Sequence, residues 1–144
     1  MAVRNYKVGQ NLKGNLFQAL LTASASDTVA ADGTAYAYIG PSGVGNIWYP
    51  TQVAVTCSGI TATTNPEAFL YTCPNLPLPQ IKTLFSSNQV TLLGSTLSGG
   101  GDSIGLINIT IPWGTCLIVK WTGGPPTGVA VMTVFGTQNA TYFT

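Results

Sequence analysis

The chain has 144 residues, of which 45% are hydrophobic and only 6% are charged, and its formal net charge is +1. This length suits one domain with a sizeable core, and a chain so apolar and so poor in charge is excluded from the disordered class. The small net charge gives no overall attraction to nucleic acid or to an anionic membrane, so neither is an expected partner.

The sequence contains no uninterrupted apolar stretch of about 18 residues, the length expected of a membrane helix. Its first fifteen residues also lack the apolar core and the small-residue cleavage site of a secretory signal peptide. We therefore expect a protein that is made and used without crossing a membrane by that route.

Residues 1–15 are expected to form an extended or weakly ordered arm. Arg4, Lys7 and Lys13 are three of the five cations of the chain, and no acid precedes Asp27. The arm is either a solvated basic tail or a segment that docks on an acidic neighbouring surface. Three charges over ten residues are too few to indicate nucleic-acid binding. We take these three side chains as candidate contacts with a partner protein.

Short strands separated by glycine and proline turns follow the arm. The expected strands are residues 17–26, 34–39, 47–57 and 68–73. Asp32-Gly33 is a turn signal, and Pro50 should begin or interrupt its strand because proline cannot donate to a β-ladder. Residues 74–79 contain three prolines and are expected to be an extended connection, whereas Ile81, Leu84 and Phe85 have the spacing of one short helical turn.

Three apolar runs dominate the last third of the chain: residues 104–111, 115–121 and 129–135. Their Val, Ile and Thr content and their glycine and proline boundaries predict an antiparallel meander. Strand alternation places Leu117, Val119 and Trp121 on one face of the second run and Cys116, Ile118 and Lys120 on the other. In the third run Val129, Val131 and Phe135 oppose Ala130, Met132 and Val134.

Because these two runs are apolar on both faces, each needs a second cover besides its own core. We interpret that cover as a neighbouring subunit. The predicted subunit interface consists of Cys116, Ile118, Lys120, Ala130, Met132 and Val134. Lys120 either lays its aliphatic stem across an apolar patch or meets an acid of the partner.

About eight short strands in one domain predict an all-β fold. The expected architecture is a single-domain antiparallel β-sandwich or jelly roll over residues 16–144, preceded by the arm at 1–15.

The residue types give no sign of catalysis. Histidine is absent, which rules out a Ser-His-Asp or Cys-His relay, and the four acids, Asp27, Asp32, Glu67 and Asp102, are scattered through predicted loops. Three cysteines without histidine make a poor zinc site. We predict no enzyme activity, no catalytic residue, no metal and no cofactor.

Cys57, Cys73 and Cys116 are expected to be buried free thiols. If 51–57 and 68–73 form a hairpin, Cys73 lies about five residues along the ladder from the residue opposite Cys57, too far for a disulfide.

Aromatic side chains beside turns offer a second kind of site. Trp48, Tyr49 and Trp113 could display a glycan-binding platform, or they could fill the ends of the sandwich. The platform is the site expected if the protein is a carbohydrate-binding module.

Three stretches carry the features of a resemblance, which are Thr-, Gly- and Ala-rich strands and, in the last stretch, a WTGG turn and a strand ending in VFGT. They are residues 35–55 (AYAYIGPSGVGNIWYPTQVAV), 99–106 (GGGDSIGL) and 119–138 (VKWTGGPPTGVAVMTVFGTQ). In these features, over about a third of its length, the chain resembles small virion proteins of tailed bacteriophages, especially those infecting actinobacteria.

The resemblance implies a non-enzymatic structural protein of the virion, assembled in the bacterial host cytoplasm. The leading expectation is a capsid decoration (cement) protein that binds the major capsid protein or other virion proteins and forms a homo-oligomer, with a trimer favoured. In that role Arg4, Lys7 and Lys13 would contact the capsid. The alternative is a carbohydrate-binding or adhesin module of a tail fibre or minor tail protein.

Overall fold

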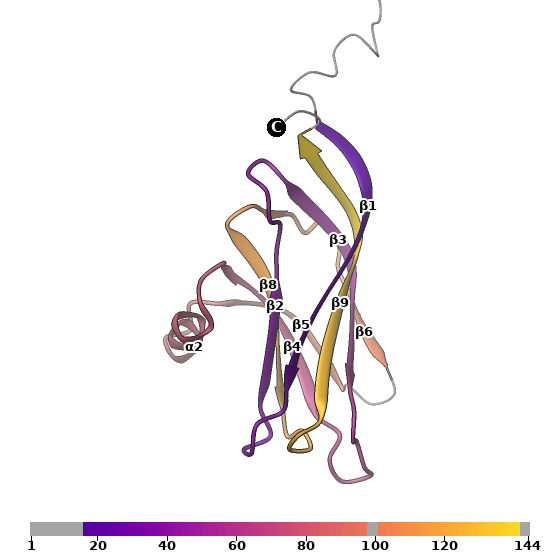
Figure 1. Cartoon of the computed structure of the whole chain (residues 1–144), viewed down its shortest axis with the longest axis vertical. Coiled ribbons are helices and arrows are strands. Elements are labelled where there is room, and N and C mark those ends of the chain that lie inside the picture. Colours follow the sequence, from indigo (N-terminus) through magenta and orange to yellow (C-terminus); the bar gives the residue numbers. More distant parts are fainter. Residues whose placement is uncertain (1–15, 98–100, 142–144) are drawn as a thin grey trace, which may run out of the picture.

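Two antiparallel β-sheets make up most of the protein, which a computed structural model describes over residues 16–97 and 101–141 (Figure 1). Sheet A has the spatial order β1 (Leu16–Thr28), β9 (Val129–Thr141), β3 (Ile47–Cys57) and β6 (Asp102–Gly105), and the short β7 (Ile111–Pro112) also pairs with β3. Sheet B has the order β2 (Ala35–Ile39), β8 (Thr115–Thr122), β4 (Glu67–Pro74) and β5 (Thr91–Leu97). Helix α2 (Leu78–Ser86) lies outside sheet B, away from sheet A.

The strand order is that of a jelly roll. With β7 set aside, the first strand pairs with the last (β1·β9), the second with the next to last (β2·β8), and so inward to β3·β6 and β4·β5. A long antiparallel hairpin rolled into two sheets gives this pattern, with β9 also pairing β3 and β8 also pairing β4. The predicted all-β sandwich is thus confirmed.

The main core lies between the two sheets, where alternate residues of every strand point inward. Its largest fully buried members include Val53, Val55, Met132 and Val134 from sheet A and Leu70, Leu117, Val119 and Trp121 from sheet B. The expected shared face of Leu117, Val119 and Trp121 is confirmed.

A bulge interrupts the middle of β3 at Pro50, as the sequence predicts. The register against β9 shifts between Pro50 and Gln52, so the proline lies where no ladder hydrogen bond is required of it. Gly136 lies opposite, and a Cβ at Gly136 would come within 2.3 Å of the Tyr49 carbonyl oxygen. The close approach of the two strands at this bulge therefore requires glycine.

Helix α2 covers the outer side of sheet B and makes a second, smaller core. Ile81 of the helix is fully buried against Cys73, Cys116 and Ile118. The helix includes Leu78 and Pro79, so the expectation of an extended connection through residue 79 is wrong there. Proline is tolerated in the first helical turn because its missing N–H has no intrahelical partner in any case.

The expected meander is wrong. Strands β8 and β9 lie in different sheets, and residues 106–110 form a loop between β6 and β7 rather than the middle of one strand. Asn108 takes a left-handed conformation (φ 57°), and Ile107 is 84% exposed in this loop. The hairpin considered for β3 and β4 is not formed either, because the chain crosses from sheet A to sheet B between them.

Candidate functional site

The predicted subunit interface is wrong for the apolar residues, because the chain covers them itself. Ala130, Met132 and Val134 face the main core, while Cys116 and Ile118 lie under α2, and all five are fully buried. A side chain with no exposed surface cannot contact a second subunit. The inference that both faces of β8 need a cover was sound, but the cover of the second face is the protein's own helix.

Lys120 remains half-buried on the same face as Cys116 and Ile118, beside α2. Its ammonium lies 5.5 Å from the Phe85 ring centroid, so its stem crosses an apolar surface, as one of the two expectations has it. Arg4, Lys7 and Lys13 lie outside the described residues.

The expected aromatic platform is wrong for Trp48, which is 5% exposed and belongs to the main core. Tyr49 follows it on β3 and therefore points the other way, where its hydroxyl accepts a hydrogen bond from Asn139 Nδ2 at 3.0 Å. Trp113, at the turn between β7 and β8, is 52% exposed. Because neighbouring residues of one strand face opposite sides, Trp48 and Tyr49 cannot form one surface.

The first candidate site is the outer face of sheet A, which carries no charged side chain among its described positions. Three rows of cross-strand partners define it: Thr22–Phe135–Gln52, Ser24–Thr133–Ala54 and Ser26–Val131–Thr56. Ser24 and Thr133 share a hydrogen bond of 3.0 Å between their hydroxyl oxygens. Phe135 is 37% exposed, and Leu20, on the same face of β1, is 81% exposed. This face is a neutral surface of small polar and apolar side chains.

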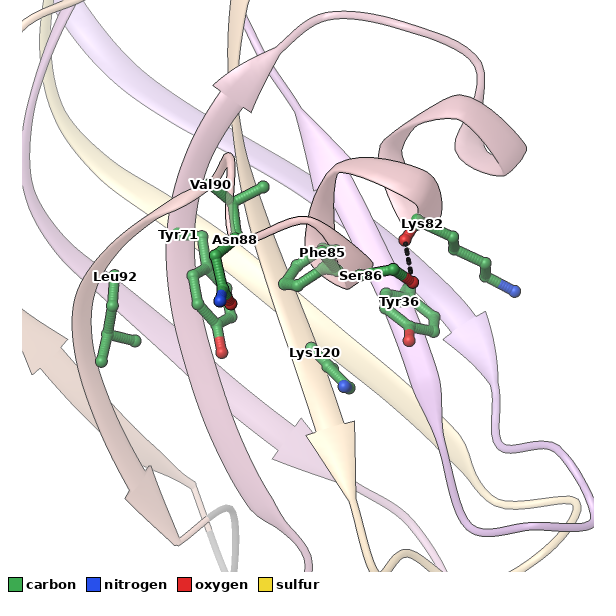
Figure 2. A pocket seen from close by; sticks show the side chains of 9 residues that line it. All are labelled: Tyr36, Tyr71, Lys82, Phe85, Ser86, Asn88, Val90, Leu92 and Lys120. Carbon is green, nitrogen blue, oxygen red and sulfur yellow. Dashed lines mark hydrogen bonds between the residues drawn. The ribbon is translucent and has the colours of Figure 1, made fainter.

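The second candidate site is a groove of about 560 Å³ between α2 and the outer face of sheet B (Figure 2). It is lined by Tyr36, Tyr71, Lys82, Phe85, Ser86, Asn88, Val90, Leu92 and Lys120. We call this set the α2 groove.

The register of sheet B determines which strand residues form the base of the α2 groove. Tyr36 on β2 is the partner of Lys120 on β8, and Tyr71 on β4 is the partner of Ile118, so all four point to the side that α2 covers. The ring of Phe85 closes over them, with its centroid 5.7 Å from that of Tyr36 and 4.7 Å from that of Tyr71, both edge-on. Edge-to-face contacts of this kind hold the rings in defined positions.

Two ammonium groups lie at the α2 groove. Lys82 Nζ is 4.8 Å from the Tyr36 ring centroid, and Lys120 Nζ is 5.9 Å from the same centroid. None of the four carboxylate side chains, all within the described residues, lies within 4.0 Å of either ammonium. The nearest effect of Lys82 on a carboxylate is small. Hydrogen bonds from Thr34 lower the pKa of Asp32, and the charge of Lys82 lowers it slightly further.

Neutral hydrogen-bonding groups complete the lining. Figure 2 shows the hydroxyls of Tyr36 and Tyr71 on either side of the Lys120 side chain, with the Asn88 amide beside Tyr71. Burial, with a smaller contribution from Tyr36, raises the pKa of Tyr71. This phenol therefore stays protonated at neutral pH, and its hydroxyl can donate a hydrogen bond to a ligand. Asn88 lies just beyond the end of helix α2, in a left-handed conformation (φ 57°) that turns the chain back toward β5.

The described residues that line the two candidate sites include no cysteine, aspartate or glutamate. The described residues contain no cluster of three or more Cys, Asp or Glu side chains that could hold a metal ion. The thiols of Cys73 and Cys116 lie outside both sites, with their sulfur atoms 3.1 Å apart and both side chains buried. The arrangement of both sites suits binding.

Comparison with protein-family models gives no match for the chain, and comparison with curated proteins gives none either. Over the described residues, no helix is long and apolar enough to cross a membrane.

Proposed function

We propose that the protein is a non-enzymatic structural protein of a bacteriophage virion, most consistent with a capsid decoration protein. In this proposal the outer face of sheet A docks on the major capsid protein or another virion protein. The single observation that carries it is the absence of charged side chains from the described positions of that face.

A neutral face suits a permanent contact for an energetic reason. Removing a charged side chain from water without a partner costs several kcal/mol, whereas Thr, Ser and Ala lose little when a neighbour covers them. Depletion of charge is also what distinguishes the centre of protein interfaces from other surface. Leu20 and Phe135 add apolar area, which stabilises a contact by roughly 25 cal/mol per Å² removed from water.

The fold and the sequence likeness both support this role. Jelly rolls occur in viral capsid proteins and in lectins, so the fold admits both the leading function and the alternative. The resemblance of residues 35–55 and 119–138 to phage virion proteins favours the virion role over the alternative. Several copies of one chain on a shell would add avidity, which fits the proposed homo-oligomer, with a trimer favoured.

Particle composition and immunogold electron microscopy test the proposal. Virions are purified from the host strain and their proteins are identified by mass spectrometry, and an antibody against the chain then locates it on the particle. We expect regularly spaced labelling of the head. Labelling confined to the tail would favour a tail-fibre or minor tail adhesin, and absence from the virion would reject both.

A further inference from the structure

We propose that the α2 groove binds an acidic saccharide, whose carboxylates are attracted by Lys120 and Lys82 on either side of Tyr36. The inference does not depend on the virion role, because it rests on the charges, the neutral groups and the volume of the α2 groove. It assigns this site a ligand class separate from the protein contact at sheet A.

The charges of the lining determine the sign of the ligand's charge. Two ammonium groups flank the ring of Tyr36, at 4.8 and 5.9 Å from its centroid, and Figure 2 shows them on either side of that ring. No carboxylate side chain lies within 4.0 Å of either. The aromatic rings attract a cation but do not neutralise it. A recess bearing charge of one sign raises the local concentration of counter-ions, so the ligand should be an anion.

The neutral groups and the volume indicate what carries the anionic group. The volume of about 560 Å³ is within the range of small-molecule sites and far larger than one inorganic anion needs. Phenol hydroxyls of Tyr36 and Tyr71 and the amide of Asn88 line the remainder and can exchange hydrogen bonds with sugar hydroxyls. Ring edges and the side chains of Val90 and Leu92 provide apolar surface for the C–H side of a sugar.

Two other anionic ligands fit less well. Nucleic acid is bound through many phosphate contacts, and the α2 groove offers two cations. An acidic peptide would present its carboxylates on flexible side chains, without ring hydroxyls for Tyr36, Tyr71 and Asn88 to bind.

The location of the α2 groove gives the ligand access. Helix α2 lies on the far side of sheet B from sheet A (Figure 1), so the two candidate sites are on opposite sides of the sandwich. If sheet A docks on a particle as proposed, the α2 groove faces the medium, where host or environmental glycans are met.

Isothermal titration calorimetry on the full chain at low salt tests the inference. The probes are trigalacturonate and a glucuronate-containing hyaluronan tetrasaccharide, compared with methyl-esterified trigalacturonate and with triglutamate. We expect saturable binding of at least one acidic saccharide. The ester should bind about tenfold more weakly because it has lost the charge-assisted hydrogen bond. Triglutamate should also bind more weakly, because it keeps its carboxylates but lacks ring hydroxyls for Tyr36, Tyr71 and Asn88. Affinity should fall as salt is raised.

Variants separate the site from general charge effects. Lys120→Gln and Lys82→Gln should each weaken binding about tenfold, whereas Val44→Asp, which lowers the net charge by the same amount at an exposed loop position outside the groove lining, should change it less than about twofold. Thermal unfolding confirms that each variant is folded. The inference is overturned if neither acidic saccharide saturates the protein, if the ester or triglutamate binds as well as the acid, or if both groove variants bind like the unaltered chain.

Discussion

Cys73 and Cys116 are directly opposite each other on β4 and β8, with their sulfur atoms 3.1 Å apart. Opposed residues of antiparallel strands have Cα separations of about 4.5–5.5 Å, inside the range that a disulfide requires. From the sequence alone, only Cys57 and Cys73 could be compared, because strand patterns do not reveal that β4 pairs with β8. Two of the expected free thiols, Cys73 and Cys116, are therefore neighbours across the strand pair.

Mild oxidation should therefore link Cys73 to Cys116. Diamide takes up the two thiol hydrogens and is reduced to the hydrazine, while the sulfur atoms form the bond. We expect a peptide cross-link between these two cysteines, with Cys57 still open to alkylation in denaturant. Closing a loop of this size should raise the free energy of unfolding by about 4 kcal/mol in the chain-entropy model.

Cys73→Ser is the control for this prediction. Diamide should leave its unfolding temperature unchanged. Cross-links that involve Cys57, or that join two chains, would show that the opposed pair is not the preferred disulfide.

Buried thiols should also make stability fall in alkali. Burial raises the pKa of Cys57, and the hydrogen bond with Cys73, followed by burial, raises that of Cys116. Above about pH 8.5 the unfolded chain loses these protons while the folded chain keeps them, so stability falls as pH rises. The pKa of Cys73 is lowered by its hydrogen bond to Cys116, which has the opposite sign but acts below that pH.

We expect the unfolding temperature to drop between pH 8 and pH 11, and to drop less in Cys57→Ala. Calorimetric scans of both proteins at the two pH values measure this. Equal drops in the two proteins would mean that the Cys57 thiol does not contribute.

At the scale of elements, strand positions and faces could be predicted from the sequence, but not the partners of the strands. Alternation correctly placed Leu117, Val119 and Trp121 on one face of β8, and a turn at Asp32-Gly33 is present, with Gly33 at φ 84°. Pairing depends on which sheet each strand joins, and local pattern carries no information about that. The predicted meander and the predicted subunit interface were wrong for this reason.

The helix shows the same limit. The spacing of Ile81, Leu84 and Phe85 indicated a helical turn, but nothing in the sequence said that it would cover Cys116 and Ile118. The α2 groove was missed because its lining comes from β2, β4, α2, β5 and β8, which only the fold brings together. The Lys120 face was the one signal that could have led to it.

Ile81→Ala tests the role of α2 as the second cover. Ile81 is fully buried, so its truncation should lower the free energy of unfolding by about 2–5 kcal/mol. Ile107→Ala is the matched control, because the same side chain is 84% exposed there and should cost less than about 0.5 kcal/mol. Urea unfolding curves give both values, and similar costs at the two positions would mean that α2 does not pack as described.

At the scale of the whole molecule, the two sides of the sandwich differ in character. The outer face of sheet A is neutral at its described positions, while the side covered by α2 carries Lys82 and Lys120. We infer that the neutral side is permanently covered in the assembly and that the lysine-bearing side is available to ligands.

Deleting residues 1–13 should leave the fold intact and weaken attachment to the particle. The deletion removes Arg4, Lys7 and Lys13 but stops before β1, which begins at Leu16. An unchanged unfolding temperature with reduced occupancy on virions, measured by quantitative mass spectrometry, is the expected result. Full occupancy of virions by the shortened chain would show that the arm does not contribute to attachment.

The most direct test of the central claim is the occupancy of virions by the double variant Thr22→Lys/Thr56→Lys. Both residues are exposed on the outer face of sheet A, one on each side of β9, so the variant adds two charges to the proposed contact. The control is Val44→Lys/Ile107→Lys, which adds the same charge at exposed positions in loops. We predict that both proteins fold and that only the control binds particles at the level of the unaltered chain. Equal binding by the two variants would contradict the assignment of sheet A as the docking face.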